Sequence, residues 1–269
     1  MASEKASETG TLGIILIGDE ILSGSVVDKN SDYIIKAFTR IGYEVEEIRI
    51  IPDRRDRIAE CFREFAARFD YVISSGGVGP THDDITLESA ADAFDVPLVL
   101  DEKLSSFLEN HYGDRMTESL RRMAMVPKGA ETGFEYSDGS WPLIRFSNVF
   151  ILPGLPRALQ DKVDRIIERI QPKGGFTYAE VFLTARESDY VDWLNTVQEE
   201  NPDVAIGSYP YWDQPEYKTR ITVRSRNAET VQAVTGTIVD FARENGWLVR
   251  WNVEGHSASA AEHRNAGQE

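Results

Sequence analysis

The chain has 269 residues, of which 41% are hydrophobic and 28% charged, and its formal net charge is −16. This length exceeds that of most single domains, so we expect two domains. The acidic balance disfavours nucleic acid as a partner, because affinity for phosphate backbones comes mainly from lysine and arginine. No apolar run reaches the roughly 18 residues of a membrane span, and the N-terminus lacks the pattern of a secretory signal. We therefore expect a soluble, cytoplasmic protein.

The first part of the chain alternates short β-rich runs with amphipathic helices. Strands are predicted over 12–17, 43–51, 71–74 and 145–152, and helices over 30–40, 53–68, 86–94, 101–112, 117–125 and 156–170. Such alternation is typical of a parallel sheet with helices on both faces. It predicts a three-layer α/β domain with a mostly parallel sheet over residues 10–171. The Pro-Lys-Gly-Gly segment at 172–175 breaks the last helix and marks the domain boundary.

A second, smaller domain is predicted over residues 176–252. Its elements are strand 178–184, helix 188–200, strands 204–208 and 218–225, helix 228–245 and strand 247–251. The order βαββαβ indicates a small α+β domain of the split-βαβ type. Residues 253–269 have no apolar periodicity, so we expect a disordered tail there.

Two loops that follow strands of the first domain carry carboxylates. Gly18, Asp19 and Glu20 come directly after the first strand, and Asp53 comes after the second. Ligands of open parallel sheets bind at the carboxyl ends of the strands, so these side chains are candidates for contacts to a ligand or metal. Asn30, at the start of the next helix, is a candidate polar contact. The alternative for Asn30 and Asp53 is a helix N-cap.

The loop after the third strand is rich in glycine and ends in two carboxylates. Gly76, Gly77 and Gly79 allow the backbone to approach a ligand closely, so a phosphate could lie on their amides. Asp83 and Asp84 offer hard oxygen ligands of the kind that Mg²⁺ or a similar divalent ion prefers. The alternative is that the glycines form a tight turn and the aspartates cap the next helix.

Four further features each allow two interpretations. His82 could bind a metal or phosphate, or be exposed, and Cys61 lies at helical spacing from apolar neighbours, which favours a packing thiol over a nucleophile. Gly154, in a Leu-Pro-Gly-Leu-Pro turn, could close the ligand pocket or belong to a rigid connector. The aromatic residues of 207–212 could stack on a nucleotide base or flavin, or pack between domains.

Together these loops resemble a known family. Residues 18–24 with Asn30, the Pro-Asp pair at 52–53, residues 76–86 and residues 152–156 resemble the molybdopterin-binding-like domain of molybdenum cofactor biosynthesis proteins. The same domain forms the N-terminal half of the competence/damage-inducible protein A family. The Gly-Pro-Thr-His-Asp-Asp sequence and residues 207–212 are most similar to the domain that precedes eukaryotic FAD synthase.

The resemblance implies one of two activities. Molybdopterin adenylyltransferases of this superfamily use two aspartates, and Asp84 and Asp53 hold the matching positions. Other members resemble metal-dependent pyrophosphatases that cleave ADP-ribose or FAD, and we favour this hydrolase activity. The alternative is a molybdopterin-binding protein or an adenylyltransferase of molybdenum cofactor biosynthesis. The ligand is then a small nucleotide or pterin.

The pyrophosphatase hypothesis assigns a role to each candidate residue. Asp84 and Asp53 are the predicted catalytic residues, and Asp83 with Asp84 holds Mg²⁺, Co²⁺ or Mn²⁺. The predicted phosphate and ligand contacts come from all of these loops: Gly18, Asp19, Glu20, Asn30, Gly76, Gly77, Gly79, Thr81 and Gly154. Because related domains commonly self-associate, the resemblance also makes a homo-oligomer an expectation.

Overall fold

The computed structural model describes residues 10–133 and 141–255. The chain divides into two compact units, one with residues 1–39 and 43–171, the other with residues 40–42 and 172–269. Within the described ranges, no helix is long and apolar enough to cross a membrane.

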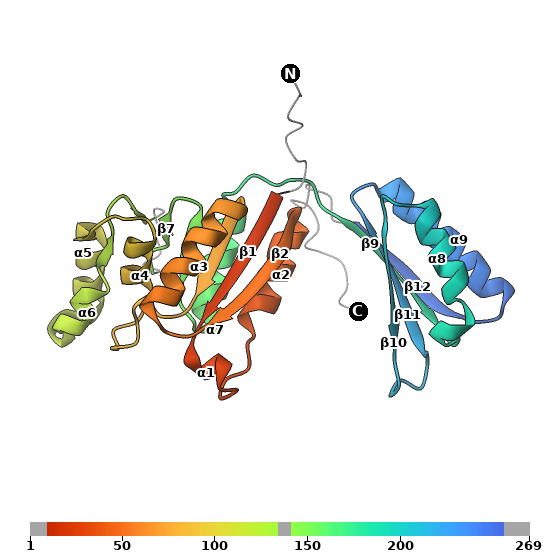
Figure 1. Cartoon of the computed structure of the whole chain (residues 1–269), viewed down its shortest axis with the longest axis horizontal. Coiled ribbons are helices and arrows are strands. Elements are labelled where there is room, and N and C mark those ends of the chain that lie inside the picture. The colour runs from red at the N-terminus through yellow and green to blue at the C-terminus, as the bar shows by residue number, and fades with distance from the viewer. Residues whose placement is uncertain (1–9, 134–140, 256–269) are drawn as a thin grey trace, which may run out of the picture. The chain divides into compact units, whose positions relative to one another are not determined.

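A six-stranded sheet forms the centre of the first unit, in the order β2-β1-β3-β8-β7-β6 (Figure 1). Its parallel strands are β1 (Gly10–Ile17), β2 (Tyr43–Ile51), β3 (Tyr71–Ser75) and β8 (Val149–Leu152). Strands β7 (Ile144–Phe146) and β6 (Glu131–Thr132) add antiparallel pairs at one edge. The sheet is therefore mostly parallel, which confirms the predicted α/β class.

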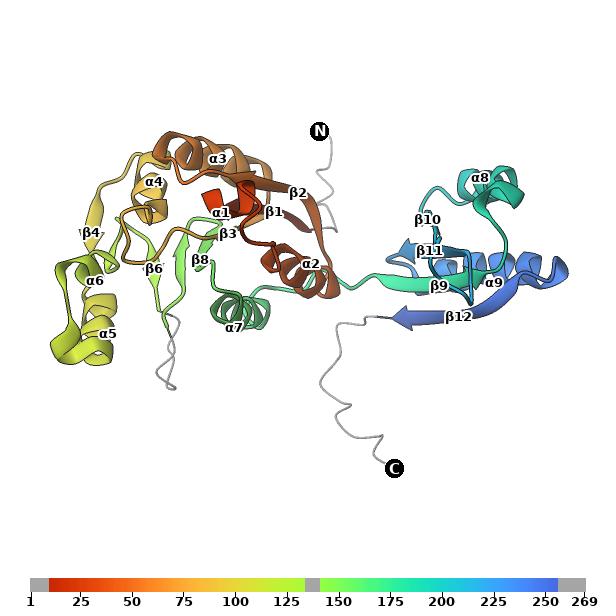
Figure 2. The same cartoon turned by 90° about the horizontal axis from the view of Figure 1, so that it is seen from below.

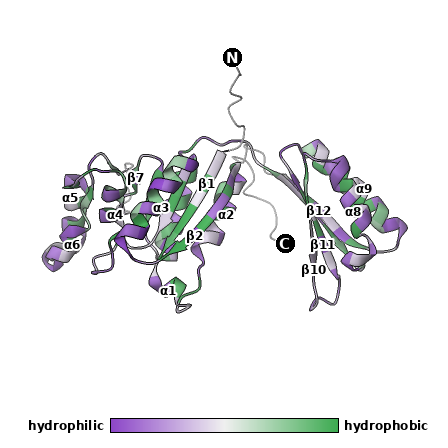
Figure 3. Ribbon diagram, in the orientation of Figure 1, coloured by the Kyte–Doolittle hydropathy of each residue, from purple (hydrophilic) through white to green (hydrophobic). Residues whose placement is uncertain are grey.

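Helices cover both faces of this sheet (Figure 2). On one face lie α3 (Arg55–Arg68) and α4 (Thr86–Ala93), and on the other α2 (Asn30–Arg40) and α7 (Pro156–Ile167). Ile58, Phe62 and Phe65 recur at helical spacing along α3 and pack against alternate residues of β1, including Ile15 and Ile17. The hydropathy colouring shows apolar strands beneath helices with polar outer faces (Figure 3).

A small subdomain lies between α4 and β6 in the chain. It contains β4 (Leu98–Leu100), α5 (Glu102–Tyr112), a 3₁₀ turn (Gly113–Arg115), α6 (Glu118–Arg122) and β5 (Met125–Pro127). Strands β4 and β5 pair antiparallel, and Leu104, Leu108, Ala124 and Val126 form a separate apolar cluster. The Asp101 side chain accepts the backbone N–H of Leu104 at 2.7 Å and caps α5.

The single strand predicted over 145–152 is instead the hairpin β7–β8. Ser147 adopts a positive φ of 55°, which reverses the chain, and Asn148 donates from Nδ2 to the carbonyl oxygens of Ala66 and Phe69 at 3.0 and 2.8 Å.

Strands β4, β5 and β6 were not predicted, because two or three residues show no periodicity. The helix predicted over 117–125 ends at Arg122, since residues 125–127 pair with β4. The loop expected at 18–24 begins with a short helix, α1 (Asp19–Leu22).

The second unit is a four-stranded antiparallel sheet in the order β10-β11-β9-β12, with helices α8 and α9 packed against it. Its elements are β9 (Thr177–Leu183), a 3₁₀ turn (Glu187–Asp189), α8 (Val191–Glu200), β10 (Ala205–Pro210), β11 (Thr219–Ser225), α9 (Ala228–Glu244) and β12 (Leu248–Gly255). The small α+β region is thus confirmed.

Strand β12 extends three residues into the predicted tail. It remains paired with β9 as far as Gly255, which lies opposite Thr177, and Val253 packs against the core of the unit. The prediction that the tail begins at residue 253 was therefore wrong. Pairing with β9 extends the strand to Gly255, although the local sequence gives no signal for a strand there. The rest of the predicted tail, residues 256–269, lies outside the described residues.

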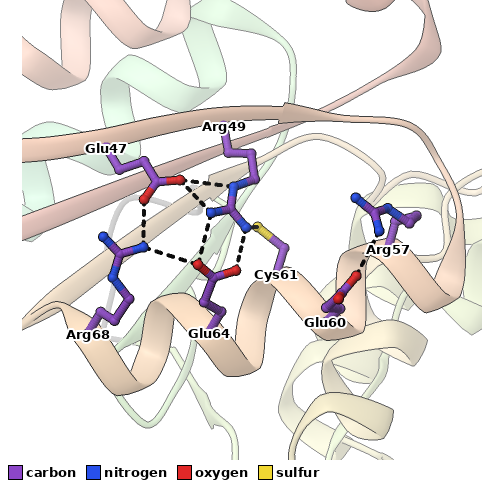
Figure 4. A network of polar contacts seen from close by, with 7 residues as sticks. All are labelled: Glu47, Arg49, Arg57, Glu60, Cys61, Glu64 and Arg68. Carbon is purple, nitrogen blue, oxygen red and sulfur yellow. Dashed lines mark hydrogen bonds and ion pairs between the residues drawn. The ribbon is translucent and has the colours of Figure 1, made fainter.

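An ion-pair network joins β2 to α3 (Figure 4). The Arg49 guanidinium donates to Glu64 at 2.5 and 3.0 Å and to Glu47, while Arg68 contacts both carboxylates. The hydrogen bond from Arg49 lowers the pKa of Glu64 to about 2. Cys61 lies beneath this network with 2% of its surface exposed, and burial raises the pKa of its thiol to about 11. This burial agrees with the packing interpretation of Cys61 rather than the nucleophile.

Candidate functional site

The loops that follow β1, β2, β3 and β8 meet at one edge of the first unit's sheet. The backbone N–H of Gly18 donates to the Ile51 carbonyl at 3.1 Å, and that of Gly76 donates to the Leu152 carbonyl at 3.0 Å. A Cβ on Gly154 would lie 3.6 Å from the Cα of Gly76. These contacts bring together the loops in which the sequence placed the candidate ligand contacts.

Asp53 lies at the junction of the first three of these loops. Its Oδ2 accepts the backbone N–H of Asp19 at 2.8 Å, the first amide of α1. A Cβ on Gly77 would lie 3.6 Å from Oδ1 of Asp53, so this carboxylate borders the glycine loop. The cap position of α3 is Arg54, so Asp53 is not the N-cap of that helix.

The surroundings of Asp53 are strongly acidic. Burial raises the pKa of Asp53, and the hydrogen bond from the Asp19 amide opposes this shift. The negative charges of Glu20, Asp19 and Asp83 raise the pKa further. The site therefore gathers several carboxylates around one half-buried member.

The glycine loop is closed against the start of α4. Gly76 and Gly77 have φ values of 115° and 66°, and a side chain on Gly77 would lie 2.3 Å from Oγ1 of Thr86. That buried hydroxyl donates to the Gly76 carbonyl at 2.9 Å, and the Thr86 N–H donates to the Gly77 carbonyl at 3.0 Å. Thr86 was predicted only as the start of the helix, yet it holds the loop to α4.

The second half of the loop is ordered by Asp84. Its Oδ2 accepts the backbone N–H of Thr81 at 2.8 Å and the Thr81 hydroxyl, and lies 2.7 Å from where a Gly79 Cβ would be. Asp83 is exposed, and its pKa is lowered mainly by the neighbouring Thr81 side chain. The side chain of His82 is 98% exposed. Asp84 therefore points into the loop, while Asp83 and His82 face solvent.

Asn30 ties two of the converging loops together. It is 8% exposed, and its Nδ2 donates to Ser75 Oγ at 3.0 Å and to the Gly154 carbonyl at 2.8 Å. Its Oδ1 is buried with no hydrogen-bond partner among the described residues. The side chain of Asp28, and not that of Asn30, accepts the first N–H groups of α2. Sequence reasoning missed Ser75, whose signal was a hydroxyl at the buried end of a strand.

The site offers only a few side-chain ligands for a divalent metal. Among the described residues, no three His, Cys, Asp or Glu side chains lie close enough to hold an ion by themselves. Mg²⁺, however, commonly binds through one or two carboxylates, with substrate phosphates and waters completing its shell. Asp53 and Asp84 border the same glycine loop and offer hard oxygens. Two hard oxygen ligands beside the glycine loop are therefore available to a divalent ion.

The fold and the loops define an α/β protein with a small-ligand site at the carboxyl ends of its strands. Residues 13–172 match the family model described as "Probable molybdopterin binding domain", and the chain belongs to this family. Residues 175–247 match a second model, "FAD synthase, middle domain". The predicted resemblance is confirmed in both parts of the chain.

Relatives support the same assignment. A protein from Archaeoglobus fulgidus is 38% identical over 73% of this chain and 84% of its own length. A "Probable FAD synthase" from Caenorhabditis elegans is 30% identical over 85% of this chain, which spans 49% of that protein. The crystal structure of CinA from Thermoplasma acidophilum, a protein of unknown function by its own description, matches with a TM-score of 0.55 and 30% identity. The match covers 60% of this chain and 98% of CinA.

Proposed function

We propose that the first unit is a divalent-metal-dependent pyrophosphatase, which hydrolyses the diphosphate of a dinucleotide such as ADP-ribose or FAD. The observation that carries this proposal is the position of Asp53 beside the Gly77 backbone, among the charges of Asp19, Glu20 and Asp83. The similarity to FAD synthase, whose product is a dinucleotide, supports the substrate class.

The charge of the site supports the metal dependence in this proposal. A diphosphate on the glycine loop would add negative charge close to Asp53, which already lies among other carboxylates. Two like charges about 4 Å apart repel by roughly 4 kcal/mol at an effective dielectric constant near 20. A divalent cation held by these carboxylates would offset this repulsion. The acidic surroundings of Asp53 therefore support a role for a divalent cation in binding an anionic substrate.

Each part of the site has a role in this proposal. The backbone amides of Gly77 and Gly79, with the N-terminus of α4, hold the phosphate oxygens. Asp53 and Asp84 hold the metal, which neutralises the diphosphate and lowers the pKa of water when bound. Asn30 acts as a positioning residue, because it joins Ser75 to the Gly154 turn.

The first prediction tests this activity directly. Purified protein with Mg²⁺, Co²⁺ or Mn²⁺ is expected to release AMP from ADP-ribose or FAD, and a chelator is expected to abolish the release. Asp53→Asn keeps an acceptor for the Asp19 amide but removes the charge, so kcat/KM should fall by roughly 10² to 10³-fold. Asp84→Ala should also abolish the release. Product formation is measured by chromatography and mass spectrometry.

Asp56→Asn is the matched control, because its side chain lies on α3 and is 70% exposed. This variant should keep the activity of the unchanged protein. The proposal is wrong if a folded sample releases AMP with no combination of metal and dinucleotide. It is also wrong if Asp53→Asn and Asp56→Asn lose activity equally.

A molybdopterin-binding protein or molybdopterin adenylyltransferase is the second candidate, favoured by the description of the matching family. A binding protein would be stabilised by a pterin that is recovered unchanged. An adenylyltransferase would consume ATP together with molybdopterin and release pyrophosphate. The same mass-spectrometric assay distinguishes these outcomes from hydrolysis.

A further inference from the structure

Strand β12 forms one edge of the sheet in the second unit (Figure 2). It pairs antiparallel with β9 on its inner side, and no strand in the described parts of the chain pairs with its outer side. The backbone N–H and C=O groups along such an outer edge are able to pair with a strand from another chain. Strand β12 therefore offers a row of donors and acceptors that its own sheet does not use.

The helix side of this edge carries exposed apolar surface. Trp251 lies opposite Val181 of β9, a core residue beneath the helices, so the indole points to the helix side. Val253, opposite Ala179, has the same orientation. Trp251 nevertheless remains 46% exposed. Tryptophan is enriched in the cores of protein interfaces, so this exposed ring favours contact with another protein surface.

A groove of about 630 Å³ lies between β12 and α9, beside Trp251. Gly236 of α9 lines it, and a Cβ there would meet nothing within 4 Å. Val239 and Val253 add apolar surface to the two walls. The helix wall also has polar members: Gln232, Asp240 and Arg243. An indole that reaches across the edge from another chain can enter the groove at Gly236, because no side chain fills that position.

The opposite face of the edge carries charges of opposite sign, four residues apart. Arg250, Asn252 and Glu254 alternate with Trp251 and Val253, so they point away from the helices. The guanidinium of Arg250 is held at this face by Glu216, at 3.1 Å, and lies 4.2 Å from the ring centroid of Phe182. The order of Arg250, Asn252 and Glu254 is self-complementary about its centre, as a two-fold axis requires.

We propose that β12 pairs antiparallel with β12 of a second copy of this chain, about a two-fold axis at Asn252. Arg250 of each copy then lies opposite Glu254 of the other, on the open face of the sheet. Trp251 of each copy lies opposite Val253 of the other, beside the groove. Moving the axis by one residue places Arg250 or Glu254 opposite Asn252 and loses both charge pairs. The charges thus select one register, and they favour a second copy over an unrelated strand.

Disulfide formation tests this register. Asn252→Cys places a thiol at the two-fold axis, where directly opposed Cα atoms lie about 4.5 to 5.5 Å apart, within the reach of a disulfide. The native cysteine, Cys61, is 2% exposed and does not compete. The whole chain with Asn252→Cys is expected to form a covalent dimer under mild oxidation. Non-reducing gels detect the dimer, and mass spectrometry of the linked peptides locates the bond.

Ala205→Cys is the matched control, because Ala205 is exposed and lies on β10, at the other edge of the same sheet. Arg250→Cys is a second control, since its two thiols would lie roughly 14 Å apart in the proposed register. Neither variant should form a covalent dimer, and circular dichroism verifies that all three fold. A folded Asn252→Cys chain that dimerises no faster than either control overturns the proposal.

Charge reversal tests the pairing of Arg250 with Glu254. In the Asn252→Cys chain, Glu254→Arg places like charges opposite each other twice, so the covalent dimer should form at least tenfold more slowly. Adding Arg250→Glu restores opposite charges and should recover most of the rate. Glu199→Arg, an equal change of charge at an exposed position of α8, should leave the rate unchanged. Equal rates for Glu254→Arg and Glu199→Arg overturn the register.

These experiments are independent of the proposed activity. They measure a bond between two β12 strands, and the hydrolysis assay measures AMP. A chain that forms the Asn252→Cys dimer without releasing AMP refutes only the pyrophosphatase proposal. A chain that hydrolyses ADP-ribose without forming this dimer refutes only the pairing of β12.

Discussion

Gly76 shows how strongly the site depends on a single backbone position. It has a φ of 115°, and a Cβ there would lie 2.0 Å from the backbone carbonyl oxygen of Ile17 in β1. Its N–H donates to the Leu152 carbonyl. Gly76 therefore joins the ends of three strands, and any side chain would push β1 and β3 apart.

Replacement of Gly76 by alanine is expected to lower the free energy of unfolding of the first unit by about 3 kcal/mol or more. The expected loss has two causes, the strain of a positive φ and the clash of the new Cβ with Ile17. Gly24→Ala separates them, because Gly24 also has a positive φ, of 74°, but a Cβ there meets nothing within 4 Å. That change should cost only about 1 to 2 kcal/mol. Urea unfolding followed by circular dichroism measures both, and equal losses would show that the contact with Ile17 is unimportant.

At the scale of elements, α7 carries a buried lysine. Lys162 is 7% exposed, and its Nζ donates to the carbonyl oxygens of Trp141, at 3.1 Å, and of Pro142. Burial lowers the pKa of Lys162 from 10.5 to about 8, with a smaller effect from the charge of Arg165. The helix thus holds the chain before β7 with a cation that is costly to bury.

This lysine should make stability depend on pH. Between pH 8 and 10.5 the unfolded chain binds the Lys162 proton more tightly than the folded chain, so the free energy of unfolding rises with pH there. The gain is at most about 3 kcal/mol. Urea unfolding between pH 7 and 10 should show a rise that is smaller in Lys162→Met. If the free energy of unfolding rises equally with pH in the unchanged protein and in Lys162→Met, the lowered pKa of Lys162 is contradicted. Two groups act in the opposite direction: Cys61 above pH 9 and Tyr43 above pH 10, because burial raises their pKa values to about 11 and about 12.

At the scale of the whole molecule, each unit has its own apolar core. In the second unit Val181 and Ile221 of the sheet pack against Val234 and Ile238 of α9, all nearly inaccessible to solvent. A separate core is the physical requirement for independent folding. The order of strands in this unit also satisfies every internal strand pairing without the first unit.

A fragment of residues 172–255 is therefore expected to fold alone. It should show a cooperative thermal transition by circular dichroism, because the buried apolar surface lies within the fragment. Val181→Asp, which places a charge in that core, should abolish the transition. A gradual, non-cooperative melt of the unmodified fragment would mean that its stability depends on the rest of the chain.

Features with a local signal were predictable from the amino-acid sequence. Buried strands and amphipathic helices repeat with short periods, so the α/β and α+β parts were predictable. The glycines of 76–79 and the carboxylates at strand ends marked the site because residue type alone restricts backbone shape and ligand chemistry. Short strands such as β4 have no such signal.

The partners of these residues could not be predicted and depend on how the chain packs in three dimensions. Asn30 is hydrogen-bonded to Ser75 and to Gly154, 45 and 124 residues away. Asp53 accepts the first amide of α1, and Arg54 occupies the cap position of α3. A cavity beside the glycine loop is likewise lined by segments that meet only in the fold. Contacts between distant segments depend on how the layers pack, and no local pattern encodes that packing.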